Sequence, residues 1–244
     1  SKKTINYSST ITPKISYRIN PGDMKDQGTL GRRINVGNIF SINRLGIEDE
    51  FESGQSLTYG VNYRKSSIQK EQYFDYTLAA VLRDKKNEKI PESTSINNKN
   101  SNIFGSFKNK LSENIFIDYN FSVDNDLTTF HYNSISTTFK VNNFVTKFNF
   151  VEENNKYVDT NTLSNVTTYN FAKDNFISFK TRRNRKINLT EYYDLIYEYK
   201  KDCLVAGLKY RKTYYEDREL KPKEDLLFTI TLIPLTTYEH NFDR

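Results

Sequence analysis

The chain has 244 residues, of which 36% are hydrophobic and 14% aromatic, with 36 basic and 30 acidic side chains. The aromatic content argues against disorder, because disordered chains are poor in aromatic and β-branched residues. The basic residues are scattered and match no nucleic-acid-binding motif, which argues against a nucleic-acid partner. No run approaches the ~18 apolar residues of a membrane helix, although a barrel that crosses in short strands would escape this test.

Strands are predicted wherever apolar and polar residues alternate, because successive side chains of a strand point to opposite faces. No helical period interrupts the series, so the sequence predicts an all-β antiparallel meander of about twelve strands. They are expected near residues 14–19, 56–64, 74–82, 103–108, 115–124, 128–140, 144–150, 163–171, 176–182, 193–200, 203–211 and 226–233.

The connections between these strands alternate in length. Residues 110–113, 141–143, 172–174 and 200–202 make short connections, whereas residues 20–54, 84–100, 152–159, 183–190 and 215–224 make longer ones. The connection at residues 124–127 is the exception, since it should be long and is short. Outer-membrane barrels have tight periplasmic turns and longer extracellular loops, and a soluble sandwich has no reason to sort its loops in this way. The pattern therefore predicts a transmembrane β-barrel.

Two stretches carry a family resemblance. The first comprises residues 38–45 (NIFSINRL) and 51–63 (FESGQSLTYGVNY), and the second residues 197–210 (YEYKKDCLVAGLKY) and 214–220 (YYEDREL). Together they resemble the C-terminal half of the outer-membrane lipopolysaccharide-assembly family LptD. Residues 87–188 match that family only in their strand pattern.

The resemblance implies that residues 1–244 are the C-terminal portion of a barrel too large for about twelve strands to close. The N-terminal periplasmic domain and the first strands would be absent, in agreement with the missing signal peptide. The family is not enzymatic and needs no cofactor. Lipopolysaccharide would arrive over a periplasmic LptA-like bridge and leave sideways, between the first and last strands, into the outer leaflet of a Gram-negative outer membrane. An LptE-like lipoprotein would plug the lumen.

Four groups of residues are expected to form sites, and the first three are a cysteine, a gate strand and the lining of the lumen. Cys203, the single cysteine, is expected to form a disulfide with a partner outside this chain, as the family does in this region, or to be an unpaired buried thiol. The strand at residues 226–233, taken as the last, is expected to form one side of the exit gate, through Leu226, Phe228, Ile230, Leu232 and Pro234. The lumen is expected to be lined by the polar residues Arg64, Asp118, Asp194, Glu198, Lys209 and Arg211.

A basic cluster of Arg182, Arg183, Arg185 and Lys186 is expected at the extracellular rim, where it would meet anionic headgroups or simply be solvated. The acidic residues Glu48, Asp49, Glu50 and Glu52 have no metal-binding spacing, and two histidines are too few to indicate zinc, so no metal is expected. A diffusive porin or receptor barrel is the alternative function. A barrel lipase or protease is disfavoured, because no Ser/His or Asp/His constellation is visible.

Overall fold

The computed structural model describes residues 7–67, 71–155, 158–215, 221–232 and 236–243, the last of these as backbone only. These residues form thirteen strands and one turn of 3-10 helix, η1 (Glu92–Thr94), which confirms the all-β prediction. The strands are β1 (Tyr7–Asn20), β2 (Gly54–Ser67), β3 (Tyr73–Arg83), β4 (Ile103–Ser112), β5 (Ile115–Val123), β6 (Phe130–Val141), β7 (Phe144–Asn154), β8 (Asp159–Ala172), β9 (Asn175–Asn184), β10 (Leu189–Lys201), β11 (Leu204–Thr213), β12 (Lys223–Leu232) and β13 (Thr236–Asp243). Within the described ranges, no helix has the length and apolar character needed to cross a membrane.

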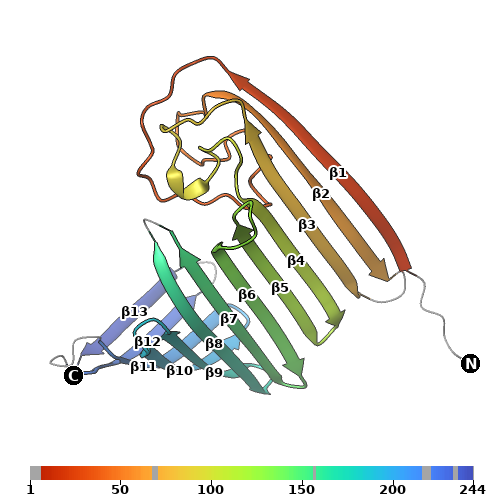
Figure 1. Ribbon diagram of the computed structural model, residues 1–244. Helices are drawn as coiled ribbons and strands as arrows, with labels where there is room; N and C mark the ends of the chain where they lie inside the picture. Colours follow the sequence, from red (N-terminus) through yellow and green to blue (C-terminus); the bar gives the residue numbers. More distant parts are fainter. Residues whose placement is uncertain (1–6, 68–70, 156–157, 216–220, 233–235, 244) are drawn as a thin grey trace, which may run out of the picture. The chain divides into compact units, whose positions relative to one another are not determined.

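The strands form an antiparallel meander, in which their order in the sheet is their order in the chain (Figure 1). The tightest connections among the described residues are the two-residue turns at 113–114, 142–143, 173–174 and 202–203. Asn142 and Asp202 have positive φ angles of 51° and 46° in two of these turns. Asn and Asp tolerate this left-handed backbone, which matches the twist of the strands that a two-residue hairpin joins. The turns thus fix the register locally.

The chain divides into two compact units, Ser1–Ile135 with Glu152–Thr160, and Ser136–Val151 with Asn161–Arg244. The first unit has a hydrophobic core beside its sheet. Two long connections, residues 21–53 and 84–102, fold together against one face of the sheet, and we call them the cap. The cap contributes Met24, Ile34, Ile39, Leu45, Ile47, Ile90 and Ile96 to this core, and the strands contribute Ala79, Val81 and Phe104. We call the face that the cap covers the inner face.

The second unit is a sheet with two contrasting faces. Leu195, Tyr197 and Leu208 are 40–51% exposed on one face, whereas Asp194 and Ile196 on the other are buried. We call these the apolar face and the charged face of this unit. A sheet that exposes its apolar side chains is suited to an apolar solvent.

The largest differences from the sequence prediction are the start of β1 and a strand that follows β12. β1 begins at Tyr7 rather than near Lys14, because residues 7–13 are polar and weakly alternating, yet they pair in register with β2. The strand at residues 226–233 is not the last one, since β12 is followed by β13, which pairs with it from Leu232↔Thr236 to Asp225↔Asp243. Residues 236–243 have little apolar alternation, and their backbone pairing left no signal in the sequence.

Candidate functional site

An ion network ties β10 to β11 on the charged face of the second unit. Arg211 donates two hydrogen bonds to Asp194, from Nε to Oδ1 at 2.6 Å and from Nη2 to Oδ2 at 2.7 Å. Lys209 lies 3.4 Å from the same carboxylate, and the Arg211 guanidinium lies 4.6 Å from the centre of the Tyr192 ring. Asp194 is only 2% exposed. Asp194, Lys209 and Arg211 were all predicted to face the lumen, and they share one face of the sheet and are in contact.

The other residues expected to line the lumen are separate from this network. Arg64 on β2 lies opposite Asp75 on β3, with 3.7 Å between Nη1 and Oδ2. Asp118 on β5 lies opposite Lys108 on β4 and accepts a hydrogen bond of 2.7 Å from Asn120. Glu198 is exposed on β10, opposite Gly207. Their orientation toward a lumen remains a prediction.

Aromatic rings line the apolar face of the second unit near its two-residue turns. Phe144 stacks on Tyr169 with 4.5 Å between ring centres, and Phe171 lies 6.4 Å from Tyr169 and 6.3 Å from Tyr197. The Tyr197 hydroxyl donates a hydrogen bond of 2.6 Å to Asn175, at the start of β9. Aromatic side chains with one apolar and one wet end gather at membrane–water interfaces. These stacked aromatic residues have the composition typical of a membrane–water interface.

A buried ion cluster attaches the cap to the inner face of β2 and β3. Arg44 is fully buried and donates two hydrogen bonds to Glu52, including one of 2.6 Å from Nε to Oε2. It also bonds Thr58 Oγ1 at 2.8 Å, and Arg83 forms an ion pair with the same carboxylate. Glu52 is 4% exposed. Removing one partner of such a pair leaves a buried charge uncompensated, so the cluster holds the cap firmly in place.

Burial by itself would raise the pKa of Glu52. The hydrogen bonds from Arg44 and the positive charges of Arg44, Arg83 and Arg18 outweigh it, so the pKa of Glu52 is lowered below its ordinary value. The carboxylate is therefore charged wherever the protein is folded at neutral pH.

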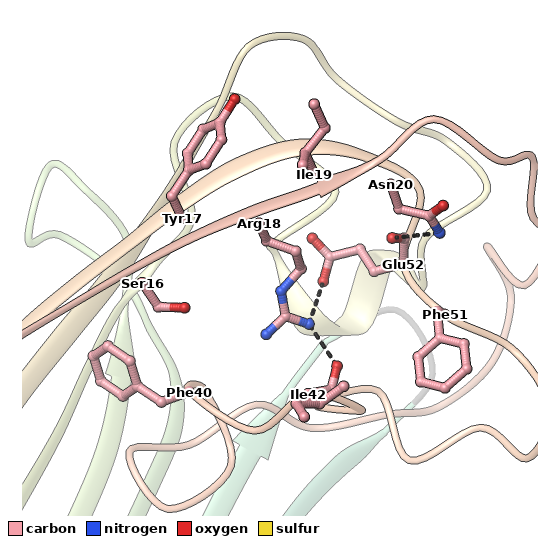
Figure 2. A pocket seen from close by; sticks show the side chains of 9 residues that line it. All are labelled: Ser16, Tyr17, Arg18, Ile19, Asn20, Phe40, Ile42, Phe51 and Glu52. Carbon is pink, nitrogen blue, oxygen red and sulfur yellow. Dashed lines mark hydrogen bonds and ion pairs between the residues drawn. The ribbon is translucent and has the colours of Figure 1, made fainter.

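Arg18 extends this cluster to the edge of β1 (Figure 2). It donates hydrogen bonds of 2.7 Å to the carbonyl oxygens of Ser41 and Ile42, and its Nη1 lies 4.0 Å from Glu52 Oε2. A cavity of about 400 Å³ opens here, lined by Ser16, Tyr17, Arg18, Ile19, Asn20, Phe40, Ile42, Phe51 and Glu52. Ile42 is 83% exposed, so apolar and cationic groups of the cap lie side by side at this edge.

The sequence pattern did not predict this cluster. Glu52 was one of four neighbouring acids without metal-binding spacing, and the structure surrounds it with arginines. Residues 20–54 were predicted only as a long connection. The available signal was Ile34, Ile39, Leu45 and Ile47, whose apolar side chains are too numerous for a solvated connection.

The residues of the expected basic rim do not converge. Arg182 pairs with Glu191 at 2.8 Å, and Arg183 bonds Asn188 in the β9–β10 turn. Arg185 lies over the Phe150 ring at 5.4 Å, and the Lys186 backbone bonds Asn184 at 3.1 Å. Arg182 and Arg183 also fall on opposite faces of β9, because side chains alternate. Whether this region lies at an extracellular rim and meets anionic headgroups remains a prediction.

Cys203 is free and exposed in the turn before β11, so the structure does not support a buried thiol. Its disulfide remains a prediction. Four residues of the expected gate strand, Leu226, Phe228, Ile230 and Leu232, share one face of β12. They lie between β11 and β13 rather than at an edge. Pro234 lies outside the described residues.

Residues 1–176 of the chain match the family described as LptD, LPS transport system D. This match covers more than half of the chain. The chain belongs to the LptD family. The matched residues include the first of the two stretches that carried the resemblance, and the second, from Tyr197 onward, lies beyond them. No curated protein matches the chain. LptD is a transport family, and an all-β meander is the architecture expected for an outer-membrane member of it.

Proposed function

We propose that this chain forms the C-terminal portion of an outer-membrane β-barrel and helps to insert lipopolysaccharide into the outer leaflet through a lateral opening. Membership of the LPS transport family supports lipopolysaccharide as the cargo. The exposed apolar side chains support a lipid environment, since Ile15 on β1 is 75% exposed and Leu195 on β10 is 51% exposed. Exposing such side chains to water along a whole sheet is unfavourable, and exposing them to acyl chains is not.

The observation that carries the proposal is the cap. It packs residues from two long connections against the inner face, with the Glu52 cluster buried beneath them. A cargo with several acyl chains that moved along this face would meet a packed polypeptide. A sideways exit keeps those chains in an apolar phase throughout, which supports a lateral route.

The proposed opening lies at the outer edge of β13. β12 is paired on both sides, by β11 and by β13, so it is not a free side of a seam. In the described residues β13 pairs only with β12, and a membrane does not tolerate unpaired strand edges. The family resemblance implies a first strand in the full-length protein that would close against β13, and we place the gate at that seam.

The same proposal gives the orientation and the partners. The short turns, including residues 202–203, would be periplasmic and the cap extracellular, as in other outer-membrane barrels. An LptE-like lipoprotein would occupy the lumen beside the charged face. An LptA-like bridge would deliver lipopolysaccharide to an N-terminal periplasmic domain.

The test is a cysteine cross-link in the full-length protein between Thr237 of β13 and the facing first strand. Locking this seam should abolish surface delivery of lipopolysaccharide while leaving the barrel folded. The matched control joins Ala206 to Ile230, which are already cross-strand partners in β11 and β12, and this link should leave delivery intact. Delivery that continues with the β13 seam locked would rule out this exit.

A further inference from the structure

The two segments of the cap form one body. Gln27 N donates to Lys89 O at 2.9 Å, and Glu92 N donates to Gly28 O at 3.0 Å. The Ser93 hydroxyl bonds the carbonyl oxygens of Leu30 and Arg32 at 2.9 and 2.8 Å. These bonds join residues about sixty positions apart in sequence, so the segments should move together if they move at all.

One end of this body is anchored where water has no access. Glu52, Arg44 and Arg83 have side chains that are 0–2% exposed, and the core residues Val81 and Phe104 lie beneath the same region. Opening this end would expose the core and separate buried charges. We therefore regard it as the fixed end.

At the other end, the cap residue Arg33 contacts both β6 and β7. Its guanidinium lies 4.1 Å from the centre of the Tyr132 ring on β6 and forms an ion pair with Glu153 on β7. Glu153 is 7% exposed and also accepts a hydrogen bond of 3.0 Å from Asn155. The Arg33 side chain is 44% exposed, in contrast to the buried arginines of the fixed end.

This contrast makes the two attachments unequal. Arg33 is in contact with water and can exchange its carboxylate partner for solvent, while the buried Glu153 keeps the hydrogen bond that Asn155 donates to it. The division of the chain into units also passes through β6 and β7, after Ile135 and before Glu152. Tyr132 and Glu153 therefore lie close to the places where these strands leave the first unit.

We propose that the contact of Arg33 with Tyr132 and Glu153 is a releasable latch between the cap and the ends of β6 and β7. When the latch opens, these strand ends move away from the cap while the Glu52 end stays closed. The cap is thus a hinged body with one permanent and one reversible attachment to the sheet.

A charge exchange across the latch tests this in the full-length protein. Arg33→Glu places two carboxylates together, and Glu153→Arg places two guanidinium groups together. Each single variant should accelerate amide hydrogen exchange about tenfold at residues 130–133 and 151–154. The double variant, in which the charges are exchanged, should recover most of the protection. Exchange in β2 and at residues 44–52 should not change in any of them.

Two outcomes would overturn the latch. One is unchanged exchange at these strand ends in both single variants. The other is a double variant with no more protection than the worse single variant, since that would show a loss of packing rather than a loss of pairing. If a charge reversal prevents folding, Arg33→Gln tests the same point, with an expected acceleration of about threefold at the same amides and none in β2. Amide exchange reports the movement itself, so the result does not depend on whether the protein delivers lipopolysaccharide.

Discussion

The ring of Phe121 on β5 occupies the space that a side chain at Gly105 on β4 would need. The two residues are direct cross-strand partners, and a Cβ added at Gly105 would overlap the ring. Phe121 also stacks on Tyr119, with 5.4 Å between ring centres, which limits how far it can shift. The glycine is therefore required for packing rather than for backbone conformation.

Gly105→Ala should lower the free energy of unfolding by about 1–3 kcal/mol, because the new methyl group forces the ring off its rotamer. Gly31→Ala is the matched control, since a Cβ at Gly31 meets no atom within 4 Å. Denaturant titration of both variants measures the difference. Equal stability of the two would contradict the packing role of Gly105, and adding Phe121→Leu to Gly105→Ala should restore part of the loss.

Glu52→Gln should destabilise the cap by about 3–5 kcal/mol, because it leaves Arg44 and Arg83 buried without a counter-charge. Glu50→Gln is the control: Glu50 pairs at 3.8 Å with a Lys25 side chain that is 83% exposed, and its loss should change stability by less than about 1 kcal/mol. Amide exchange at residues 34–47 measures cap opening. A Glu52→Gln cap as well protected as the Glu50→Gln cap would show that the cluster does not anchor it.

The cap should also lose stability as the pH becomes acidic. Glu52 has a lowered pKa in the folded protein, so its contribution is fully present above the ordinary carboxyl pKa of about 4.3 and is lost as the pH falls through the lowered value. Pepsin cleavage within residues 21–53, measured at decreasing pH, should rise in that acidic range. Glu52→Gln should remove this contribution to the pH dependence. A profile identical in the two proteins would exclude Glu52 as the group that titrates.

The period of two was sufficient to assign the faces of the strands. Leu208 and Lys209 fall on opposite faces of β11 because alternation depends only on neighbouring residues. The cap could not be predicted in this way, since Glu52 meets Arg83 31 positions away in sequence, and such contacts depend on the whole fold. The strand β13 was missed because its pairing uses backbone groups, which any sequence carries.

Leu208→Lys should reduce the stability of the barrel in a bilayer by ~2–4 kcal/mol if this face meets lipid near the midplane. Thr231→Lys on β12 is the control, because Thr231 lies opposite Val205, on the charged face with Asp194. Folding titrations in lipid vesicles give both values. A penalty at Thr231 equal to that at Leu208 would mean that the two faces have the same surroundings.

Because every strand pairs with its neighbour in sequence, the sheet can grow one hairpin at a time as the chain becomes available. Most of its contacts close short loops, whose entropic cost is small. The ion pair between Arg33 and Glu153 is different, since it joins residues 120 positions apart and requires five intervening strands to be in place. It therefore forms only after these strands have paired, which makes it a late step in the folding of the first unit.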